Sequence, residues 1–269
     1  MANSVRATII CLMIVALCAT GCAGALASHP SVAPTASLPG APTLDLPGTP
    51  TSDLPDTPPA SPPSNSEWQE EFGISDCDLV PTGRNEYFIL EPGFQIVLDG
   101  RIETVKITVL DETREVDGVT TRVVEEEEWK YGELIEISRN FFAICPDTND
   151  VFYFGEEVDM YQDGALVSHS GAWLAGENDA RAGLIMPGEP EVGMRYYQEI
   201  APRVAMDRAE IVSLTDTLET PAGTFSNSLR TREGTALNPL EREYKTYAPG
   251  IGLIQDESLF LTEYGFVSE

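Results

Sequence analysis

Few side chains in this sequence suit nucleophilic or zinc chemistry. A Ser-His-Asp arrangement needs a histidine base, and His169, between Ser168 and Ser170, is the only histidine after residue 29. The segment does not match Gly-x-Ser-x-Gly, and a lone histidine between serines is typical of a solvated loop. One histidine and two distant cysteines also cannot supply a zinc site. The sequence therefore predicts no catalytic residue, no metal ligand and no cofactor.

Carboxylates are abundant instead. The 269 residues include 44 Asp and Glu against 16 Lys and Arg, for a net charge of −28, and 41 of the acidic residues lie in residues 66–269. Among so many, some pair will have glycosidase spacing by chance, so no catalytic pair stands out. The acidic excess excludes nucleic acid as an obvious partner, because phosphate binding depends on Lys and Arg.

Two acidic patterns bear on cation binding. Residues 147–158 begin like a calcium loop, but Val151 replaces an oxygen ligand and Phe152 replaces the required glycine, so an EF-hand is not expected. A second pattern could form one acidic strip across neighbouring strands: Glu125–Glu128 with Glu156, Glu157 and Asp159. Facing like charges are costly unless a cation lies between them. We hypothesise a divalent-cation site there, with a solvated acidic face as the simpler alternative.

Cys77 and Cys145 are the two cysteines of residues 67–269. In an oxidising compartment such a pair predicts a disulfide. Closing a loop of about 70 residues would stabilise the fold by roughly 4 kcal/mol, by restricting the unfolded chain. Two separate buried thiols remain the alternative, because Cys145 follows a strand whose alternate residues are expected to point inward.

Cys22 has the most specific context of any cysteine in the chain. Arg6 precedes the uncharged run 7–19, which is shorter than the roughly 20 apolar residues of a membrane-spanning helix. A basic residue, a short apolar run and small residues before a cleavage site describe a secretory signal. The sequence Ala19-Thr20-Gly21-Cys22 then resembles the lipobox of bacterial lipoproteins, which implies cleavage after residue 21 and diacylation of the Cys22 sulfur. Ordinary cleavage after Ala25 or Ala27 is the alternative.

The segment after Cys22 predicts a tether. Residues 1–21 are expected to be the lipoprotein signal peptide, and residues 22–66 a disordered linker rich in Pro, Ser and Thr with an eight-residue repeat that starts at Leu38, Leu46 and Leu54. Such a composition offers little apolar surface to offset the entropy of ordering. Two acyl chains anchor a protein durably, and Ala23 after the cysteine favours the outer membrane if the cell has two membranes.

The rest of the chain, residues 67–269, predicts a single antiparallel β domain. Hairpin signals recur at Asp99-Gly100, Asp117-Gly118, Tyr131-Gly132 and Asp163-Gly164. Apolar residues alternate between these turns, and the sets expected to share one face are Val105, Ile107 and Val109; Val119, Thr121 and Val123; Ile135, Ile137, Phe141 and Ala143; and Phe152, Phe154, Val158 and Met160. Further strands are expected at 194–200, 206–216, 223–233, 241–248 and 258–264. The predicted fold class is all-β, a curled meander sheet forming a half-open barrel or a sandwich, with few short helices.

Four segments also carry a family resemblance: Glu219–Phe225, Tyr247–Ile254, Asn140–Cys145 and Tyr153–Glu156. They are similar to segments of a group of uncharacterised bacterial secreted and lipid-anchored β-rich proteins, over most of residues 72–266. That group distantly resembles the half-barrel lipoprotein localisation factors, which hold acyl chains in their concave face. The resemblance implies a fold and an apolar or peptide ligand, and it transfers no functional residue.

These observations predict a lipoprotein of the bacterial cell envelope. We expect Cys22 to hold it on the membrane, facing the periplasm or the cell surface, and its β domain to be a non-catalytic binding module of unknown ligand. A structural envelope protein without a small ligand and a carboxylate-based hydrolase are the alternatives. A hydrolase would need a cleft where carboxylates with raised pKa values converge, and the aromatic residues that could lie beside it are Trp129, Trp173, Tyr196 and Tyr197.

Overall fold

A computed structural model describes residues 67–267, which lie in one compact unit. The predicted signal peptide, the predicted linker and Cys22 fall outside these residues. The strands are β1 (Gly83–Asn85), β2 (Phe88–Leu90), β3 (Phe94–Asp99), β4 (Glu103–Val116), β5 (Val119–Lys130), β6 (Glu133–Ile144), β7 (Val151–Gln162), β8 (Ala165–Ser168), β9 (Trp173–Leu174), β10 (Arg181–Met186), β11 (Arg195–Tyr197), β12 (Glu199–Ile200), β13 (Asp207–Thr220), β14 (Gly223–Thr235), β15 (Asn238–Ala248), β16 (Gly252–Asp256) and β17 (Leu259–Phe266). Within this range the only helix is the 3₁₀ turn η1 (Ile74–Asp76), so the all-β prediction is confirmed.

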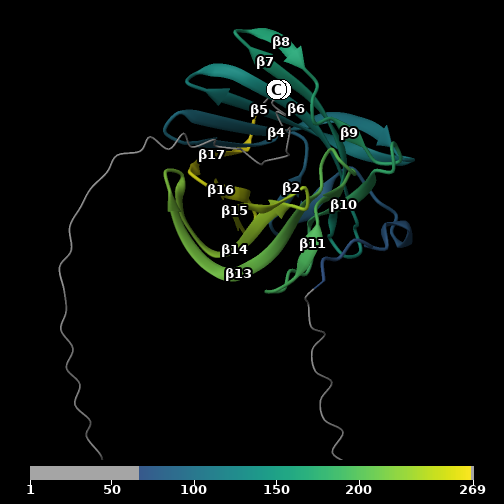
Figure 1. Ribbon diagram of the computed structural model, residues 1–269. Coiled ribbons are helices and arrows are strands. Elements are labelled where there is room, and N and C mark those ends of the chain that lie inside the picture. Colours follow the sequence, from purple (N-terminus) through teal and green to yellow (C-terminus); the bar gives the residue numbers. More distant parts are fainter. Residues whose placement is uncertain (1–66, 268–269) are drawn as a thin grey trace, which may run out of the picture. The chain divides into compact units, whose positions relative to one another are not determined.

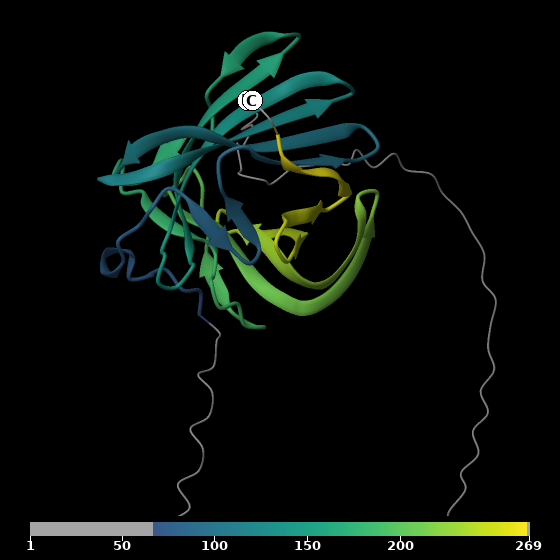
Figure 2. The same ribbon diagram turned by 180° about the vertical axis from the view of Figure 1, so that it is seen from behind.

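One antiparallel sheet curls almost into a closed barrel. Its strand order is β11-β13-β14-β15-β16-β17-β3-β4-β5-β6-β7-β10-β12, with β8 and β9 also paired to β7. Figure 1 shows β4 to β7 as one wall and the strongly bent β13 and β14 as the opposite wall. The C-terminal strand β17 joins the walls by pairing with β3, and Figure 2 shows it from behind in yellow.

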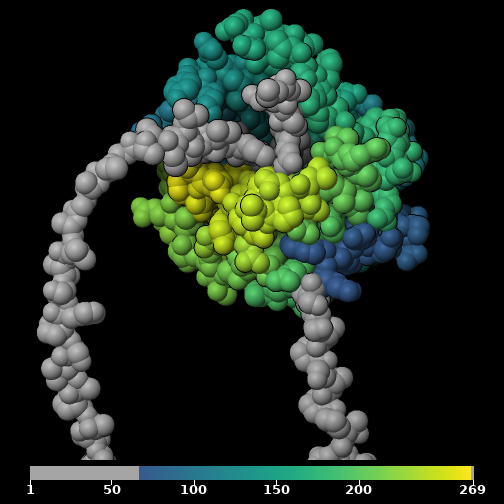
Figure 3. All heavy atoms as spheres, in the orientation of Figure 1, coloured from purple at the N-terminus to yellow at the C-terminus, as the bar shows by residue number. Residues whose placement is uncertain are grey.

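The barrel is left unsealed between β11 and β12, the two end strands of the sheet order. They follow one another in the chain, and the backbone N–H of Gln198 between them donates to Asp207 O on β13. On the face seen in Figure 3, atoms of the yellow segments β15 to β17 form a continuous surface. The half-open barrel of the prediction is therefore a nearly closed barrel with one seam.

Three of the four predicted hairpin turns have the backbone that two-residue turns require. Asp117, Tyr131 and Asp163 have positive φ and are each followed by a positive-φ glycine, as type I′ turns demand. At the fourth, β3 extends to Asp99, and Gly100 N–H donates to Glu103 O in a longer turn. The Pro221-Ala222 turn joins β13 to β14, as its proline and following glycine predict.

The N-terminal segment covers part of the outer face of the sheet. Val80 forms an isolated bridge with Ile144, and Cys77 is joined to Cys145 by a disulfide whose Cα atoms are 5.9 Å apart. The rings of Phe72 and Phe152 lie 6.4 Å apart on this face. Cys145 thus lies on the outer face, under the N-terminal segment. The sequence predicts instead that the alternate residues of the preceding strand point toward the interior.

A β-bulge on β7 makes one predicted apolar face wrong. Phe141 pairs with Gly155 while Phe142 pairs with Tyr153, so Phe154 is the extra residue and the alternation reverses there. Phe152 and Phe154 consequently lie on the outer face, and Val158 and Met160 on the inner face. Gly155 has φ 140°, and a Cβ there would lie 2.4 Å from the carbonyl oxygen of Trp173.

The prediction of which residues of β6 point into the barrel is also wrong. Ile135 and Ile137 are only half-buried, and the buried positions between them and beyond belong to Glu136, Ser138 and Asn140. The odd-numbered residues of β6 do share a face, but it is the outer one. That outer face is covered at Phe141 by Arg114 and at Cys145 by the N-terminal segment. Residues 141–145 are therefore buried on both faces, and their continuous apolar run does not indicate which residues point inward.

Candidate functional site

The inner face of the barrel changes from apolar to acidic along each cross-strand row. One row runs from Ile96 through Ile107 to Glu126, and the next from Leu98 through Val105 to Glu128 and then Glu136. A third row pairs Val124 with Asn140 and Asn140 with Glu156. Strands β3 and β4 therefore supply an apolar wall, and β5 to β7 supply carboxylates beside it.

The opposite wall adds more carboxylates. On β14 and β15, Glu233 pairs in register with Glu243, and Lys245 pairs with Asp256 of β16. Glu199 and Asp207 lie where β12 meets β13, beside the seam. We call the following residues the carboxylate cluster: Glu126, Glu128, Glu136, Glu156, Glu199, Asp207, Glu233, Glu243 and Asp256. All are buried except Asp207, whose residue surface is half-buried.

Lys245 is the cation of this cluster. Its Nζ lies 3.3 Å from Glu233 Oε2 and 3.8 Å from Asp256 Oδ2, and its side chain is 2% exposed. Glu233 also accepts hydrogen bonds from Thr231 Oγ1 at 2.7 Å and from the Tyr247 hydroxyl at 3.3 Å. Within residues 67–267 only one other buried side chain is cationic, Arg122, so the carboxylates greatly outnumber the buried positive charges.

Burial and mutual repulsion hold protons on several carboxyls of this cluster. Burial raises the pKa of Glu136 to about 8, with a contribution from the charge of Glu128. Burial also raises the pKa of Glu128 to about 7, and a hydrogen bond from Glu126 opposes the rise. The pKa of Asp256 is raised to about 7 by burial even though Lys245 lowers it. Near neutral pH these groups are partly or wholly neutral acids.

The pKa values of three further carboxyls are raised well above the ordinary value. Burial is the largest cause for Glu126, Glu156 and Glu199. A neutral buried carboxylic acid can donate a hydrogen bond, which an ionised one cannot. Glu126 therefore has one proton, which it can donate either to Glu128 or to a ligand atom.

An apolar cavity lies beside the carboxylate cluster. It has a volume of about 50 Å³, and its wall includes Phe94, Ile96, Ile107, Val109, Phe142 and Leu253. The polar residues that line it include Glu126, Asn140 and Tyr247. Glu126 Oε2 is buried without a hydrogen-bond partner in the described structure. A void of this size has room for a few groups as large as a water or a methyl.

A second hollow opens beside β9. This side pocket has a volume of about 270 Å³ and is lined by Glu156, Glu157, Trp173, Glu177, Asn178 and Val204, among others. Trp173 Nε1 donates to Glu199 Oε2 at 3.1 Å, and its ring meets that of Tyr153 edge-on at 5.0 Å between centroids. These contacts fix the indole beside Glu156, which pairs with Trp173 across the two strands.

The single acidic strip hypothesised from the sequence is divided between two faces. Glu126, Glu128 and Glu156 point inward, whereas Glu125, Glu127, Glu157 and Asp159 lie on the outer face. The outer ones meet cations: Arg139 lies 3.2 Å from Glu125, Lys106 pairs with Glu127, and Arg114 pairs with Glu157. The alternation of a strand separates neighbours in sequence, so no strip of seven acids exists. Within the described residues, no group of three or more His, Cys, Asp or Glu is placed to hold a metal ion.

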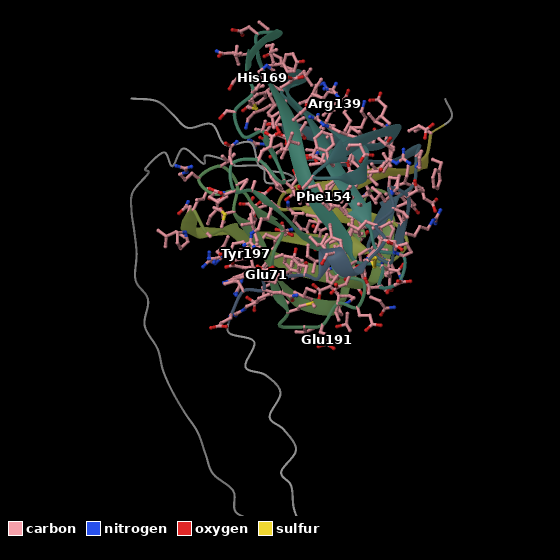
Figure 4. All side chains as sticks on the ribbon, turned by 90° about the vertical axis from the view of Figure 1, so that its right-hand side faces the viewer. Glu71, Arg139, Phe154, His169, Glu191 and Tyr197 are labelled. Carbon is pink, nitrogen blue, oxygen red and sulfur yellow. A yellow bond between two sulfur atoms is a disulfide. The ribbon has the colours of Figure 1, made fainter. Side chains whose placement is uncertain are left out.

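His169 is exposed and is not part of the carboxylate cluster. Figure 4 shows it at one end of the domain, above Arg139, with Glu71 and Tyr197 toward the other end. Its side chain is 67% exposed, and Nδ1 lies 2.8 Å from Asp159 Oδ1. Of the four aromatic residues singled out in the sequence, Trp173 and the buried Tyr196 face the interior. Trp129 lies on the outer face of the sheet against Lys106, and Tyr197 is buried against Trp68.

Comparisons with known proteins add no relative. No protein-family model matches the chain, no curated protein matches it significantly, and neither does any solved structure. The resemblance to lipid-anchored β-rich proteins and to localisation factors therefore stays a prediction. Over residues 67–267, no helix has the length and apolar character needed to cross a membrane.

Proposed function

We propose that this chain is a lipid-anchored protein of the bacterial cell envelope whose barrel binds a small, largely apolar ligand that ends in a neutral hydrogen-bonding group. The observation that carries the proposal is the apolar cavity that ends on Glu126. Desolvated carboxyls are costly to bury, and Glu126 Oε2 is buried with no partner among the described residues. A ligand carbonyl or hydroxyl at that position would accept or share its proton.

The two walls suit the two ends of such a ligand. Ile96, Ile107 and Phe94 offer apolar surface, and each buried CH₂ contributes about 0.8 kcal/mol. Asn140 is already engaged, since it donates to Ser138 Oγ at 3.1 Å and accepts from the Tyr153 hydroxyl at 3.2 Å. These hydrogen bonds fix Asn140 at the edge of the cavity. Glu126 is then the group that would hydrogen-bond to the ligand.

Native mass spectrometry of the protein purified from its own host tests the binding role. We expect a co-purifying ligand in the wild type and its loss in Val124→Trp, because an indole at position 124 would fill the cavity. Val97 of β3 points to the outer face of the sheet. Val97→Trp is therefore the matched control and should keep the ligand. A wild-type protein that shows only the mass of the lipid-modified mature chain would favour the structural alternative and contradict this proposal.

A carboxylate-based hydrolase is the second candidate, and one observation favours it. Glu156 and Glu199 both have raised pKa values, and the charge of Glu156 acts on Glu199 beside the side pocket. Such a pair can divide the roles of acid and base. If the chain is a hydrolase, Glu156→Gln should abolish turnover; if it is a binding protein, no substrate will be turned over by the wild type.

The anchor is tested separately. Residues 66–269 carry 41 acidic and 15 basic side chains, so anionic lipid repels the domain and offers no second attachment. We expect Cys22→Ser to move the protein from the membrane fraction to the soluble fraction without changing its melting temperature, and we expect labelled palmitate to enter only the wild type. Palmitate incorporation into neither form, or equal pelleting of both forms, would contradict the lipid anchor.

A further inference from the structure

The side pocket beside β9 is a site of a different kind from the apolar cavity. Three of its lining residues are acids, Glu156, Glu157 and Glu177, and no lysine or arginine lines it. Apolar side chains of Leu174, Ala180 and Val204 complete the wall. Its volume of about 270 Å³ is near the lower end of small-molecule sites, about 300 Å³.

Glu156 gives this pocket an unsatisfied polar group. The residue is 1% exposed, and neither carboxylate oxygen has a hydrogen-bond partner within residues 67–267. Glu199, its neighbour, is partly satisfied by Trp173 Nε1 at 3.1 Å. A buried carboxyl without a hydrogen-bond or ionic partner destabilises the fold. A ligand with a polar or charged group could supply the partner that Glu156 lacks.

Trp173 decides which cation fits. Indole is the best aromatic surface for a positive charge, and alkylated ammonium ions are the ligands that such surfaces select. A hydrated metal ion would instead need several oxygen ligands in a tight shell, and the described residues contain no group of acids so arranged. The apolar wall further favours an ion that carries methyl or methylene groups.

We propose that the side pocket binds a small organic ammonium ion, with Glu156 as the counter-ion and Trp173 as the aromatic wall. This site is separate from the apolar cavity and does not depend on the ligand proposed there. The bound cation favours the ionised carboxylate, so binding moves one proton from Glu156 to solvent.

Proton release makes the affinity depend on pH. The acids that face Glu156 or share its pocket are Glu128 of β5, Glu136 of β6, Glu157 of β7, Glu177, Glu199 of β12 and Asp207 of β13. Burial raises the pKa values of four of them, Glu128, Glu136, Glu199 and Asp207, so rising pH adds negative charge around the ammonium ion. We expect the affinity to rise with pH, by up to about tenfold per unit while Glu156 is neutral in the empty pocket.

Calorimetric titration of the full chain in a non-ionic detergent with choline chloride tests the proposal. The neutral isostere 3,3-dimethyl-1-butanol has the same shape without the charge and serves as the ligand control. We expect saturable binding of choline, none of the isostere, and a heat that varies with the ionisation enthalpy of the buffer because a proton is released.

Three variants locate the site. Glu156→Gln should weaken choline binding at least tenfold and remove its buffer dependence, and Trp173→Phe should weaken it several-fold. Glu125→Gln, on the outer face of the same sheet, should leave it unchanged. Absence of saturable choline binding, equal binding of the isostere, or displacement of choline by millimolar Ca²⁺ would each overturn the proposal. If Glu156→Gln fails to fold, the choline and isostere titrations of the wild type decide alone.

Discussion

Raising the pH from 5 to 8.5 is expected to lower the free energy of unfolding by at least about 3 kcal/mol, the reverse of ordinary acid denaturation. That figure is the contribution of one carboxyl whose pKa is raised to about 7. The cause is the carboxylate cluster. The pKa values of Glu128 and Asp256 are raised to about 7, and that of Glu136 to about 8. In the unfolded chain these groups titrate near their ordinary values, about 4.

The sign follows from the protons bound by each state. Between about pH 4 and pH 8 the folded domain holds protons that the unfolded chain has released, so stability falls as pH rises. A raised carboxyl pKa contributes stability that is fully present below the unfolded pKa and is lost as pH passes the folded pKa. Glu91, whose pKa is lowered by its hydrogen bond with Arg84, titrates below this window and does not offset the effect.

Urea unfolding at pH 5, 6, 7 and 8.5 measures this slope. The double variant Glu128→Gln with Glu136→Gln carries permanent neutral mimics at two of the positions, so its stability should vary much less with pH. A matched pair of outer-face changes, Glu125→Gln with Glu157→Gln, should keep the wild-type slope. A wild-type stability that is flat or rises from pH 5 to pH 8.5 would mean that the interior acids are ionised.

Lys245→Met is expected to cost about 3 to 5 kcal/mol at pH 7.5, because it leaves buried carboxylates without their cation. Lys245 Nζ is within 4 Å of both Glu233 and Asp256, and its side chain is 2% exposed. The loss should be smaller at pH 5, since removing the lysine raises the pKa of Asp256 further and acid then neutralises it.

Lys106→Met provides the matched control for that variant. Lys106 pairs with Glu127 on the outer face and is 34% exposed, so its loss should cost under about 1 kcal/mol. Comparing the two variants by urea unfolding at pH 7.5 and pH 5 separates a buried ion pair from a surface one. Equal losses for the two, or a Lys245→Met loss that grows in acid, would contradict the interior that we describe.

Local signals in the sequence were enough for most of the long strands and for three of the four predicted hairpin turns. Tyr131-Gly132 predicts its hairpin because positive φ is needed at both positions, and Pro221 with Gly223 predicts the turn after β13. The inward face was harder to predict. Gly155 hosts a bulge that reverses the alternation of β7, and period two cannot signal an extra residue in advance.

The interior acids could be predicted only in part. Val124, Glu126 and Glu128 share one phase of β5, which is the signal that some acids of the run point inward. That signal is weak, because a buried glutamate is ordinarily unfavourable. Lys245 meets Glu233 and Asp256 only because β14, β15 and β16 lie side by side. The pairing of distant strands, rather than any local motif, assembles the cluster.

Electron density inside the barrel of the protein purified from its own host is the most direct measurement of the proposed binding role. We predict continuous density along Ile96 and Ile107 that ends within hydrogen-bond distance of Glu126 Oε2, and its absence from crystals of the cavity-filling Val124→Trp variant. A cavity that is empty, or that holds only water in the protein from its host, would contradict the proposal that this barrel carries a ligand.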